Sequence, residues 1–382
     1  MPRVLVIAGS DSGGGAGLQA DVKTITMLGG HAMTAITAIT AQNTLGVQAV
    51  MQVPTAMVLA QIDSVVSDIG VDAVKIGMVG SAATAEALAE RLASLDVPIV
   101  FDPVMVASSG SRLADAATIA AFTRLVALAS VTTPNLPELA ALGGEANILS
   151  AGQALLVKGG HGEGQEVIDR LVEADGTETV WRGARIATRY NHGTGCTLAS
   201  GIAEGLARGL ALPVAVDRAR RFVRLAMLEA PGLGGGHGPM GQGRVRLDGF
   251  NAGAALNQVT LPLDDMAAST AFYRLLGLKR IVASGDRYAR FETAGGATLS
   301  VEARGEMPGT LVYLECGDLD RVLVRLREAG VAVDGPHDRP WGWREARLTD
   351  PAGNPLCLYW AGEARRFPSW RRDEEDRAPS EA

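Results

Sequence analysis

A glycine-interrupted motif that carries a thiol, Asn191-His192-Gly193-Thr194-Gly195-Cys196-Thr197, stands directly before a helical pattern. Backbone amides at a helix N-terminus attract anions, and glycines let them come close to a transferred phosphoryl group. The same field predicts a lowered pKa for the thiol of Cys196. The alternative is a buried cysteine that begins a helix and has no chemical role.

A second glycine-rich turn, Gly9–Gly17, follows an apolar run and also opens a helical pattern. By itself it indicates phosphate binding only weakly, because many such turns are simply tight. No Gly-Lys-Ser/Thr follows, so the turn is not a P-loop. The lack of a regular G-x-G-x-x-G with a matching acidic residue argues against dinucleotide binding.

Three more motifs follow apolar runs, namely Asp102-Pro103-Val104-Met105, Asn135-Leu136-Pro137-Glu138 and Lys158-Gly159-Gly160-His161. In a parallel sheet the carboxyl ends of the strands share one edge, and ligands bind there. Carboxylates, a lysine and two glycine turns on that edge suit magnesium–nucleotide chemistry, in which metal ions bridge phosphates and a lysine neutralises them. Each motif alone also fits an ordinary turn, whereas the set favours a nucleotide site.

The elements that must position these residues are short apolar runs alternating with amphipathic stretches, which predicts an α/β fold with a mostly parallel sheet flanked by helices. The predicted strands are Val4–Ala8, His31–Thr40, Ala73–Ile76, Ile99–Phe101, Val131–Thr133 and Leu155–Lys158. The predicted helices are Gln19–Leu28, Thr55–Ile69, Ala82–Leu95 and Thr197–Gly209. We assign residues 1–247 to this domain.

Residues 257–362 have a different pattern and form a second, smaller predicted domain of α+β type. Gln258–Leu263 is predicted as a strand and Ala267–Leu276 as a helix; three short strands follow, and the order repeats from Leu311. Two βαβββ units therefore make an internal repeat. The glycine-rich residues 248–256 are predicted as a linker, and the charged residues 363–382 as a disordered tail.

Composition narrows the class of protein. The 382 residues are 47% hydrophobic and 20% charged, with a net charge of −7. An acidic chain without a basic stripe is a poor candidate for binding nucleic acid or an anionic membrane. Three widely spaced cysteines do not make a disulfide framework. The first apolar run is short for a signal peptide, and the charge-free residues 24–62 are interrupted by glycine and proline, so we expect a cytoplasmic protein.

The ordered motifs together resemble the hydroxymethylpyrimidine/phosphomethylpyrimidine kinases of thiamine biosynthesis, over about residues 3–240. The segments that carry the resemblance are Ala8–Gly17 with Gln19-Ala20-Asp21, Thr40–Thr44, Lys75–Met78, Asp102–Met105, Thr133–Glu138, Val157–His161, His192–Thr197 and Gly236–Pro239. The resemblance implies a ribokinase-like fold that uses ATP and Mg²⁺. It also implies two successive phosphorylations, of 4-amino-5-hydroxymethyl-2-methylpyrimidine and then of its monophosphate.

The same resemblance implies roles for single residues. Gln42 is expected to read the aminopyrimidine edge, because a carboxamide both donates and accepts hydrogen bonds. The substrate-binding set is Gln42, Asp21, Met78, Gly9 and Val106, with Asp21 near the hydroxymethyl group. The nucleotide and magnesium set is Asp102, Asn135, Glu138, Lys158 and Thr194. Gly193, Gly195 and Cys196 form the anion hole, and Cys196 has the position of a general base.

Many ribokinase-like enzymes carry aspartate where this chain has Cys196. In the second phosphorylation the acceptor is already an anion and needs little help from a base. We therefore expect Cys196 to matter more for the first step than for the second.

Two alternatives stay open for the first domain. Pyridoxal kinases share the fold and also phosphorylate a hydroxymethyl group on an aromatic nitrogen ring. A kinase decayed into a ligand-binding protein is the other reading, against which the retained Asp102, Glu138 and Lys158 argue. The segment Leu139–Gln153 is shorter than the family usually has, which puts the affinity for nucleotide in question.

The second domain resembles the glyoxalase/bleomycin-resistance (vicinal oxygen chelate) family over about residues 257–361, through its repeat, Phe272–Leu278 and Asp350–Pro355. Metal-dependent members carry His, Gln or Glu at four equivalent strand positions. Here Gln258 and Glu302 are weak candidates for the first two, the third falls near Leu311, and the last is Cys357. Three good ligands are lacking. We expect a metal-free ligand-binding module, with a metal-dependent glyoxalase-type activity as the alternative.

Late tryptophans could build such a binding module. Trp341, Trp343 and Trp360 lie close in a sequence that is only 4% aromatic, and could line a cleft for a flat ligand. The other reading is that they pack the sheet. Nearby Arg339, Arg344 and Arg347 could pair with an anionic ligand or simply face solvent. Two-fold pairing into a homodimer is the default expectation for both kinds of domain.

Overall fold

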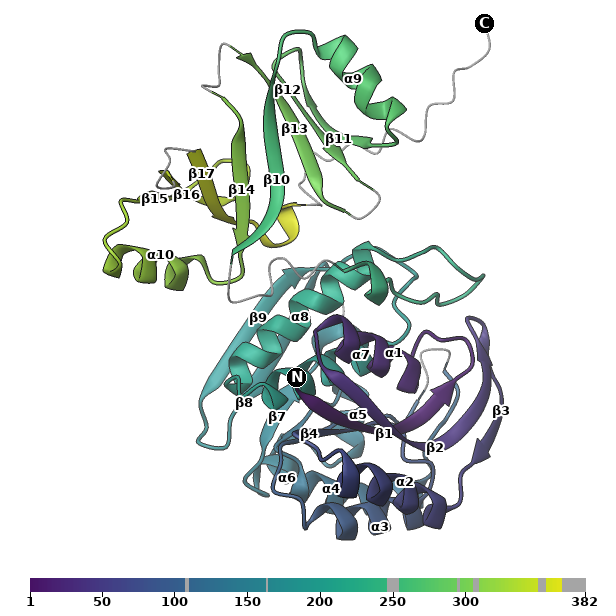
Figure 1. Cartoon of the computed structure of the whole chain (residues 1–382). Coiled ribbons are helices and arrows are strands. Elements are labelled where there is room, and N and C mark those ends of the chain that lie inside the picture. The colour runs from purple at the N-terminus through teal and green to yellow at the C-terminus, as the bar shows by residue number, and fades with distance from the viewer. Residues whose placement is uncertain are drawn as a thin grey trace, which may run out of the picture. The chain divides into compact units, whose positions relative to one another are not determined.

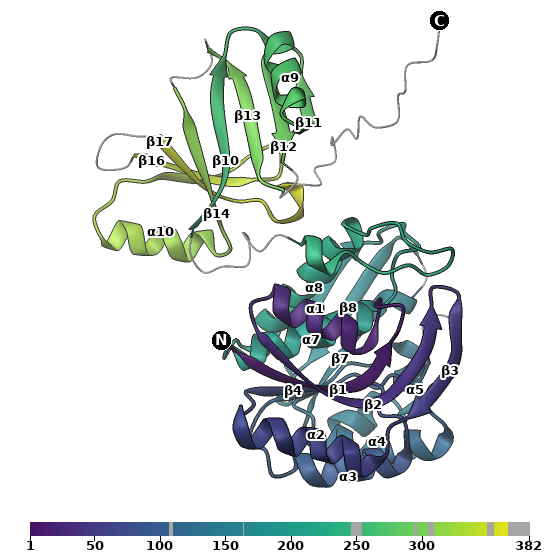
Figure 2. The same ribbon diagram turned by 45° about the vertical axis from the view of Figure 1, so that its right-hand side comes forward.

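The computed structural model describes residues 1–106, 110–162, 164–245, 254–293, 296–304, 309–349 and 355–365. The chain forms two compact units, Met1–Val245 and Arg246–Ala382 (Figures 1 and 2). Of the predicted linker 248–256, residues 254–256 already belong to a strand. Of the predicted tail 363–382, residues 363–365 belong to a 3-10 helix. The rest of both segments, and most of the motif Asp350–Pro355, lie outside the described residues.

The first unit has one nine-stranded sheet within its described residues, in the order β3-β2-β1-β4-β5-β6-β7-β8-β9. The pairs from β2 to β7 are parallel, and β3, β8 and β9 add antiparallel edges. The strands are β1 (Arg3–Asp11), β2 (His31–Asn43), β3 (Gly46–Gln52), β4 (Ala73–Ile76), β5 (Ile99–Phe101), β6 (Val131–Thr132), β7 (Ala154–Val157), β8 (Glu166–Val172) and β9 (Glu178–Ala184). The predicted mostly parallel α/β sheet is confirmed.

Helices cover both faces of this sheet (Figures 1 and 2). One face carries α2 (Thr55–Asp68), α3 (Ala82–Leu92) and α4 (Ala116–Leu128), and the other carries α1 (Gly17–Met27), α7 (Thr194–Ala207) and α8 (Leu212–Leu228). Each layer buries its own apolar core against the strands. Short helices complete the unit: α5 (Leu136–Ala141), α6 (Glu145–Leu149), η1 (Gly159–His161) and η2 (Gln242–Arg244). No described helix of the chain is long and apolar enough to cross a membrane.

Three of the chemical motifs lie where a strand of the parallel sheet ends. Asp102 directly follows β5, and Lys158 follows β7. Asn135 follows the end of β6 and begins α5, where its side chain accepts from the backbone N–H of Glu138 at 2.9 Å. The Glu138 carboxylate accepts in turn from the backbone N–H of Asn135 at 2.8 Å. This capping box holds both side chains at the carboxyl edge of the sheet.

The second unit also consists of one sheet, with eight described strands in the order β11-β12-β13-β10-β14-β17-β16-β15. The strands are β10 (Ala254–Leu263), β11 (Lys279–Ser284), β12 (Tyr288–Glu292), β13 (Thr298–Ala303), β14 (Leu311–Cys316), β15 (Asp334–Asp338), β16 (Arg344–Thr349) and β17 (Pro355–Trp360). The helices are α9 (Met266–Leu275), α10 (Leu319–Glu328) and η5 (Gly362–Arg365). The first strands of the two repeats, β10 and β14, pair antiparallel at the centre. The predicted pair of βαβββ units is confirmed.

The two faces of the second sheet differ. Leu263, Phe291 and Val301 pack against α9, and Leu358 packs with α10. On the opposite face Tyr313, Trp343 and Tyr359 form an aromatic cluster, joined by Ala364 of η5. Because successive residues of a strand point to opposite faces, this face is built from the alternate positions of β14 and β17.

The contact between α7 and α8 generates a test of the first unit's packing. A Cβ added to Gly205 would lie 2.8 Å from Cβ of Ala215, well inside contact distance. Gly205→Ala should therefore lower the free energy of unfolding by about 1–3 kcal/mol, although alanine favours helices more than glycine does. Gly243→Ala, which meets open space, is the control and should change it by less than about 0.5 kcal/mol. Urea denaturation measures both; a stabilised Gly205→Ala would refute the close helix contact.

Candidate active site

A cavity of about 770 Å³ opens at the carboxyl edge of the first sheet. Its walls come from the Gly9–Gly17 turn, from β2, from the ends of β4 to β7, and from the N-terminus of α7. All the predicted site residues of this unit except Asp21 line it: Cys196, Gly193, Gly195, Lys158, Gln42, Met78, Gly9, Val106, Asp102, Asn135, Glu138 and Thr194. The folding of one sheet edge thus brings together motifs that are far apart in the sequence.

The N-terminus of α7 faces the cavity as an anion-binding element. Gly193 precedes the helix in a left-handed conformation with φ of 86°, and no side chain caps the helix. A Cβ on Gly193 would overlap with the carbonyl oxygen of Gly15, so the two glycine turns touch backbone to backbone. Amides at such an end carry partial positive charge and suit a phosphoryl group.

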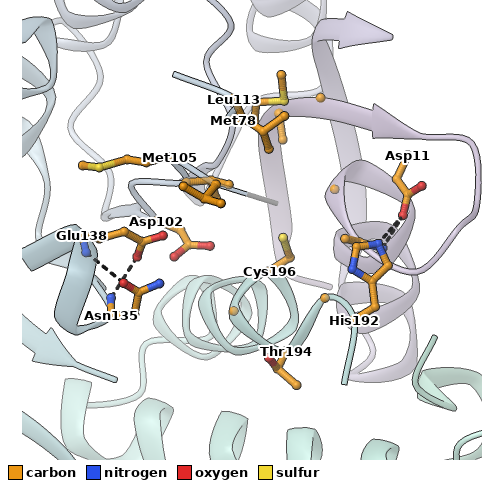
Figure 3. A pocket seen from close by; sticks show the side chains of 18 of the residues that line it. Asp11, Met78, Asp102, Met105, Leu113, Asn135, Glu138, His192, Thr194 and Cys196 are labelled. Carbon is orange, nitrogen blue, oxygen red and sulfur yellow. Dashed lines mark hydrogen bonds and ion pairs between the residues drawn. The ribbon is translucent and has the colours of Figure 1, made fainter. Parts of the chain in front are cut away.

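Cys196 lies in the first turn of α7 and is partly buried (Figure 3). Burial, helped by the nearby Asp21 and Asp102 and opposed by Lys75, raises the pKa of its thiol to about 11. The predicted lowering of this pKa is therefore wrong. The prediction considered the field at the helix N-terminus and left out the removal of the thiol from water, which favours the protonated form.

Lys158, Asp102 and Glu138 form a charged cluster on one side of the cavity. Nζ of Lys158 lies 2.6 Å from Oδ1 of Asp102 and 3.7 Å from Oε2 of Glu138. Thr133 donates to the same Asp102 oxygen at 3.1 Å. Burial raises the pKa of Glu138, with Lys158 opposing the shift. Burial alone would lower the pKa of Lys158, but the two carboxylates outweigh it and hold the pKa above its ordinary value.

The donors of this cluster fit a magnesium ion bound together with a nucleotide. Mg²⁺ prefers one or two carboxylates, with substrate phosphates and water completing its shell. Asp102 and Glu138 supply two carboxylates that already reach one common cation, the ammonium of Lys158. A Cβ on Gly195 would lie 3.3 Å from Nζ of Lys158, so the cluster directly adjoins the α7 amides.

The other side of the cavity carries a second polar group, which Figure 3 shows across the end of α7 from the first. Nε2 of His192 lies 3.0 Å from Oδ2 of Asp11 and 3.1 Å from Nε2 of Gln42. Thr40 donates to Oε1 of Gln42 at 3.2 Å. The Asp11 carboxylate also accepts from backbone amides of the glycine turn, among them Ala16. The carboxamide of Gln42 is thus held by neighbours on both of its polar atoms.

An apolar wall lies beside Gln42. Met78 packs against Gly9 so closely that a Cβ there would come within 2.9 Å of its sulfur. Val106 is half-exposed and also lines the cavity. A flat ring fits between such a wall and a fixed carboxamide.

Asp21 is the predicted site residue that the structure places elsewhere. It is fully buried, lies outside the cavity lining, and forms an ion pair with Lys75 at 3.0 Å. Burial raises the pKa of its carboxyl, with Lys75 opposing the shift. Asp21 therefore has no surface on the cavity of this structure; the lysine with which it pairs lines the cavity instead.

Sequence reasoning gave no role to Asp11, Lys75, Arg112 or His192, all of which line the cavity. Three of them stand inside quoted motifs: Asp11 in the first glycine turn, Lys75 before Met78, and His192 next to Gly193. Their position in the motifs was a usable signal. Arg112 lies outside every motif, and only the fold brings it to the site.

In the second unit the two weak metal candidates do not meet. Gln258 pairs with Thr298 across β10 and β13, whereas Glu302 pairs with Pro262, four residues farther along. Four residues of a strand span about 13 Å, which is too far for a shared ion. Leu311, the third expected position, pairs with Thr260, and the residue opposite Gln258 on β14 is Tyr313. Among the described residues of the whole chain no three His, Cys, Asp or Glu side chains converge on a metal position.

Trp341, Trp343 and Trp360 do not share one environment. Trp343 is buried and stacks on Tyr359, with 4.5 Å between ring centroids. Trp341 and Trp360 are 40% and 37% exposed and do not join that aromatic cluster. Arg347 lies over the Tyr313 ring at 5.5 Å, and Arg344 forms an ion pair with Asp320 at 2.9 Å.

Comparison with known proteins agrees with this geometry. The family model described as "Phosphomethylpyrimidine kinase" matches residues 11–241. The chain belongs to the phosphomethylpyrimidine kinase family. Residues 255–358 match the "Glyoxalase/Bleomycin resistance protein/Dioxygenase superfamily". The ribokinase-like resemblance and the fused second domain are thereby confirmed.

Named relatives cover different parts of the chain. The hydroxymethylpyrimidine/phosphomethylpyrimidine kinase of Streptomyces coelicolor is 48% identical over 63% of this chain and 94% of its own length. The thiamine biosynthesis multifunctional protein ThiED of Corynebacterium glutamicum is 32% identical over 96% of this chain, which spans about half of that relative (53%). This relative therefore aligns with the second unit as well.

Solved structures give the same fold for the first unit. A Bacillus subtilis pyridoxal kinase in complex with ADP has a TM-score of 0.58 and 31% identity, over 64% of this chain and all of its own. A phosphomethylpyrimidine kinase from Clostridium difficile 630 has a TM-score of 0.52 and 36% identity, over 59% of this chain and 98% of its own. An ADP complex in a structural neighbour supports the use of ATP by this fold.

The raised pKa of the Cys196 thiol predicts slow alkylation of the ligand-free protein. Only the thiolate reacts, and with a pKa of about 11 in place of 9.0 the thiolate fraction at pH 7.5 is about a hundredfold smaller. The rate of modification by iodoacetamide should rise about tenfold per pH unit from pH 7 to pH 9. Mass spectrometry of the Cys196 peptide measures it, and the buried Cys316 serves as an internal control. A rate that levels off near pH 7 would show a lowered pKa instead.

Proposed function

We propose that the first unit transfers the γ-phosphoryl group of ATP to 4-amino-5-hydroxymethyl-2-methylpyrimidine and then to the monophosphate so formed, within thiamine diphosphate biosynthesis. The observation that carries this proposal is that a single cavity has two ends with different chemistry. One end has Lys158, Asp102 and Glu138 beside the α7 amides, and the other has Gln42 beside Met78. The first suits phosphates with a metal ion, and the second suits a flat ring with donors and acceptors on its edge.

In this proposal the nucleotide phosphates lie against Lys158, Asn135 and Thr194. Asp102 and Glu138 would hold Mg²⁺, which supplies charge neutralisation of the phosphates when bound. The hydroxymethyl oxygen attacks the γ-phosphorus, and the bond from that phosphorus to the β–γ bridging oxygen breaks, so that ADP leaves with the electron pair. The amides of Gly195 and Cys196 face the charge that spreads over the transferred group.

Cys196 receives the hydroxyl proton in the first step. Because its thiol is protonated in the ligand-free protein, only the small thiolate fraction can act as the base. The second acceptor is a phosphate anion, which has no alcohol proton to lose. The two steps therefore place different demands on the same side chain.

We also propose that the second unit is a ligand-binding module that works without a metal. Gln258, Tyr313 and Cys357 occupy positions paired across β10, β14 and β17, and they do not form a ligand set for a divalent ion. The face around them, opposite α9 and α10, carries aromatic rings together with Arg290, whose guanidinium lies over the Trp343 ring at 5.3 Å. Rings and guanidinium groups on one face suit a planar anion.

A phosphorylation assay with Mg-ATP tests the first proposal. The full chain should convert both the hydroxymethylpyrimidine and its monophosphate to the diphosphate, as followed by chromatography. Lys158→Met should slow both steps by about a hundredfold or more, because a charged partner of the phosphates is lost. Turnover of pyridoxal alone would instead make the chain a pyridoxal kinase, and turnover of none of the three would favour a binding protein.

Within the same assay Cys196→Ala separates the two steps. It should slow phosphorylation of the alcohol by about a hundredfold and that of the monophosphate by less than about tenfold. Equal slowing of both steps would contradict a base role for Cys196.

Thermal unfolding in the presence of metal ions tests the second proposal. Zn²⁺, Ni²⁺ or Mn²⁺ should raise the melting temperature of the unaltered full chain no more than that of its Gln258→Ala variant, because an ion stabilises a fold only where it binds the native state. The double substitution Tyr313→His/Cys357→Glu, which places two ligands beside Gln258, provides a positive control. A clear rise for the unaltered chain, absent in Gln258→Ala, would favour the metal-dependent activity.

A further inference from the structure

One buried ion pair at the cavity wall has no role in the chemistry described so far. Nζ of Lys75 lies 3.0 Å from both carboxylate oxygens of Asp21, and Ser200 donates to Oδ1 of Asp21 at 2.6 Å. Neither charged side chain has any exposed surface. Lys75 comes from β4, Asp21 from α1 and Ser200 from α7, so three elements meet in one charged group.

The pair is oriented with respect to the cavity. Lys75 lines the cavity and Asp21 does not, so the pair turns its positive end toward the ligand. A Cβ on Gly77 would come within 2.8 Å of Nζ of Lys75, which places the ammonium at the level of the strand ends. Ser200 lies one turn beyond Cys196 on the same side of α7, so the group lies beneath Cys196. Because the proposed function places the hydroxyl of the acceptor at Cys196, this is the acceptor end of the site.

The charges at this end of the cavity differ from those of the cluster formed by Asp102, Glu138 and Lys158. In the other charged cluster two carboxylates, Asp102 and Glu138, surround one ammonium, an excess of negative charge that suits Mg²⁺ but opposes an anionic acceptor. Burial alone would lower the pKa of Lys75, but Asp21, with Cys196 and Asp102, outweighs it and keeps the pKa above its ordinary value. Lys75 is therefore charged throughout the working range of pH, and water does not screen it.

We infer that the Lys75–Asp21 pair is a specificity-determining element that makes the acceptor end of the cavity favour the phosphorylated pyrimidine over the neutral alcohol. This inference rests on the proposed function. The two acceptors share a ring and differ at one end, where the monophosphate carries a charge of about −1.5 to −2 near neutral pH. A fixed ammonium in a low-dielectric wall attracts that charge and leaves the alcohol almost unaffected. Lys75 acts through the wall, as a positioning residue that touches no reacting atom.

The alternative is that the pair serves only to join α1, β4 and α7. Both readings predict some loss of stability when the pair is removed, so stability alone does not separate them. Only the electrostatic reading predicts a change in the preference between the two acceptors.

The test compares Lys75→Met/Asp21→Asn with the unaltered full chain. This double substitution removes both charges and leaves an acceptor for Ser200. A matched control, Glu204→Gln/Arg218→Met, removes another ion pair, between the buried Glu204 of α7 and Arg218 of α8; Glu204 lies about 12 Å farther along α7 than Cys196. Calorimetric dissociation constants for the alcohol and the monophosphate, with KM for each, are measured for all three proteins.

The monophosphate should bind about tenfold more weakly to the Lys75→Met/Asp21→Asn protein, a change of about 1.4 kcal/mol, while binding of the alcohol changes less than about threefold. The control should leave the ratio of the two constants unchanged. If both acceptors weaken equally, or if the control shifts the ratio as much, the pair is structural and the inference is wrong. Should the first variant fail to fold, Lys75→Gln/Asp21→Asn retains a hydrogen bond across the pair and gives the same comparison.

Different outcomes would refute the kinase proposal and the inference about Lys75. Binding of both pyrimidines without turnover would refute the kinase proposal, and the ratio of dissociation constants would still decide the role of Lys75. A protein that binds neither pyrimidine would refute both.

Discussion

The close approach of two glycine turns is the constraint on which the first unit's site depends. A Cβ on Gly193 would overlap with the carbonyl oxygen of Gly15, and a Cβ on Gly17 would overlap with the carbonyl oxygen of Gly9. Side chains at these points would push the β1–α1 turn away from α7. Because the turns touch, Asp11 reaches His192, His192 reaches Gln42, and the α7 amides open into the same cavity as the ring-binding wall.

The charged side chains at the two ends of the cavity match the groups that each end is proposed to bind. At the nucleotide end two carboxylates outnumber one lysine, which leaves room for a divalent cation. At the acceptor end a buried pair turns only its ammonium toward the ligand. Between them lies a neutral thiol. A site that transfers phosphate to an alcohol and then to a phosphate has to accept one neutral and one anionic partner, and an ammonium turned toward the acceptor, apart from the carboxylates that suit the metal ion, is compatible with both.

Local sequence predicted the parts of the fold that follow from apolar periodicity and turn chemistry. The parallel strands are short apolar runs, so β1, β4 and β5 were found close to their observed bounds, as was α3. The antiparallel strands β3, β8 and β9 were missed. Every position of β3 and β9 is partly or fully exposed, so neither carries a buried run, and β8 has one only in its last two residues. Motifs at strand ends identified the cavity lining, because a parallel sheet places all those ends together. Spacing could not reveal that Asp21 turns inward to Lys75, or that burial raises the pKa of Cys196.

The second unit shows why register matters more than residue type for a metal site. Gln258 and Glu302 are both acceptable ligands by chemistry, and both lie on neighbouring strands. The parallel pairing of β10 with β13 nevertheless sets Thr298, not Glu302, beside Gln258, and Thr298 donates to its Oε1 at 3.0 Å. Across the centre, Gln258 pairs with Tyr313 of the second repeat, whose neighbour on β17 is Cys357. Two repeats can keep the strand pairing of a metal-binding fold and yet place an amide, a phenol and a thiol at its centre. Burial raises the pKa of the Tyr313 phenol and of the Cys357 thiol well above neutrality. Neutral groups of this kind offer hydrogen bonds to a ligand and do not compete for a divalent ion.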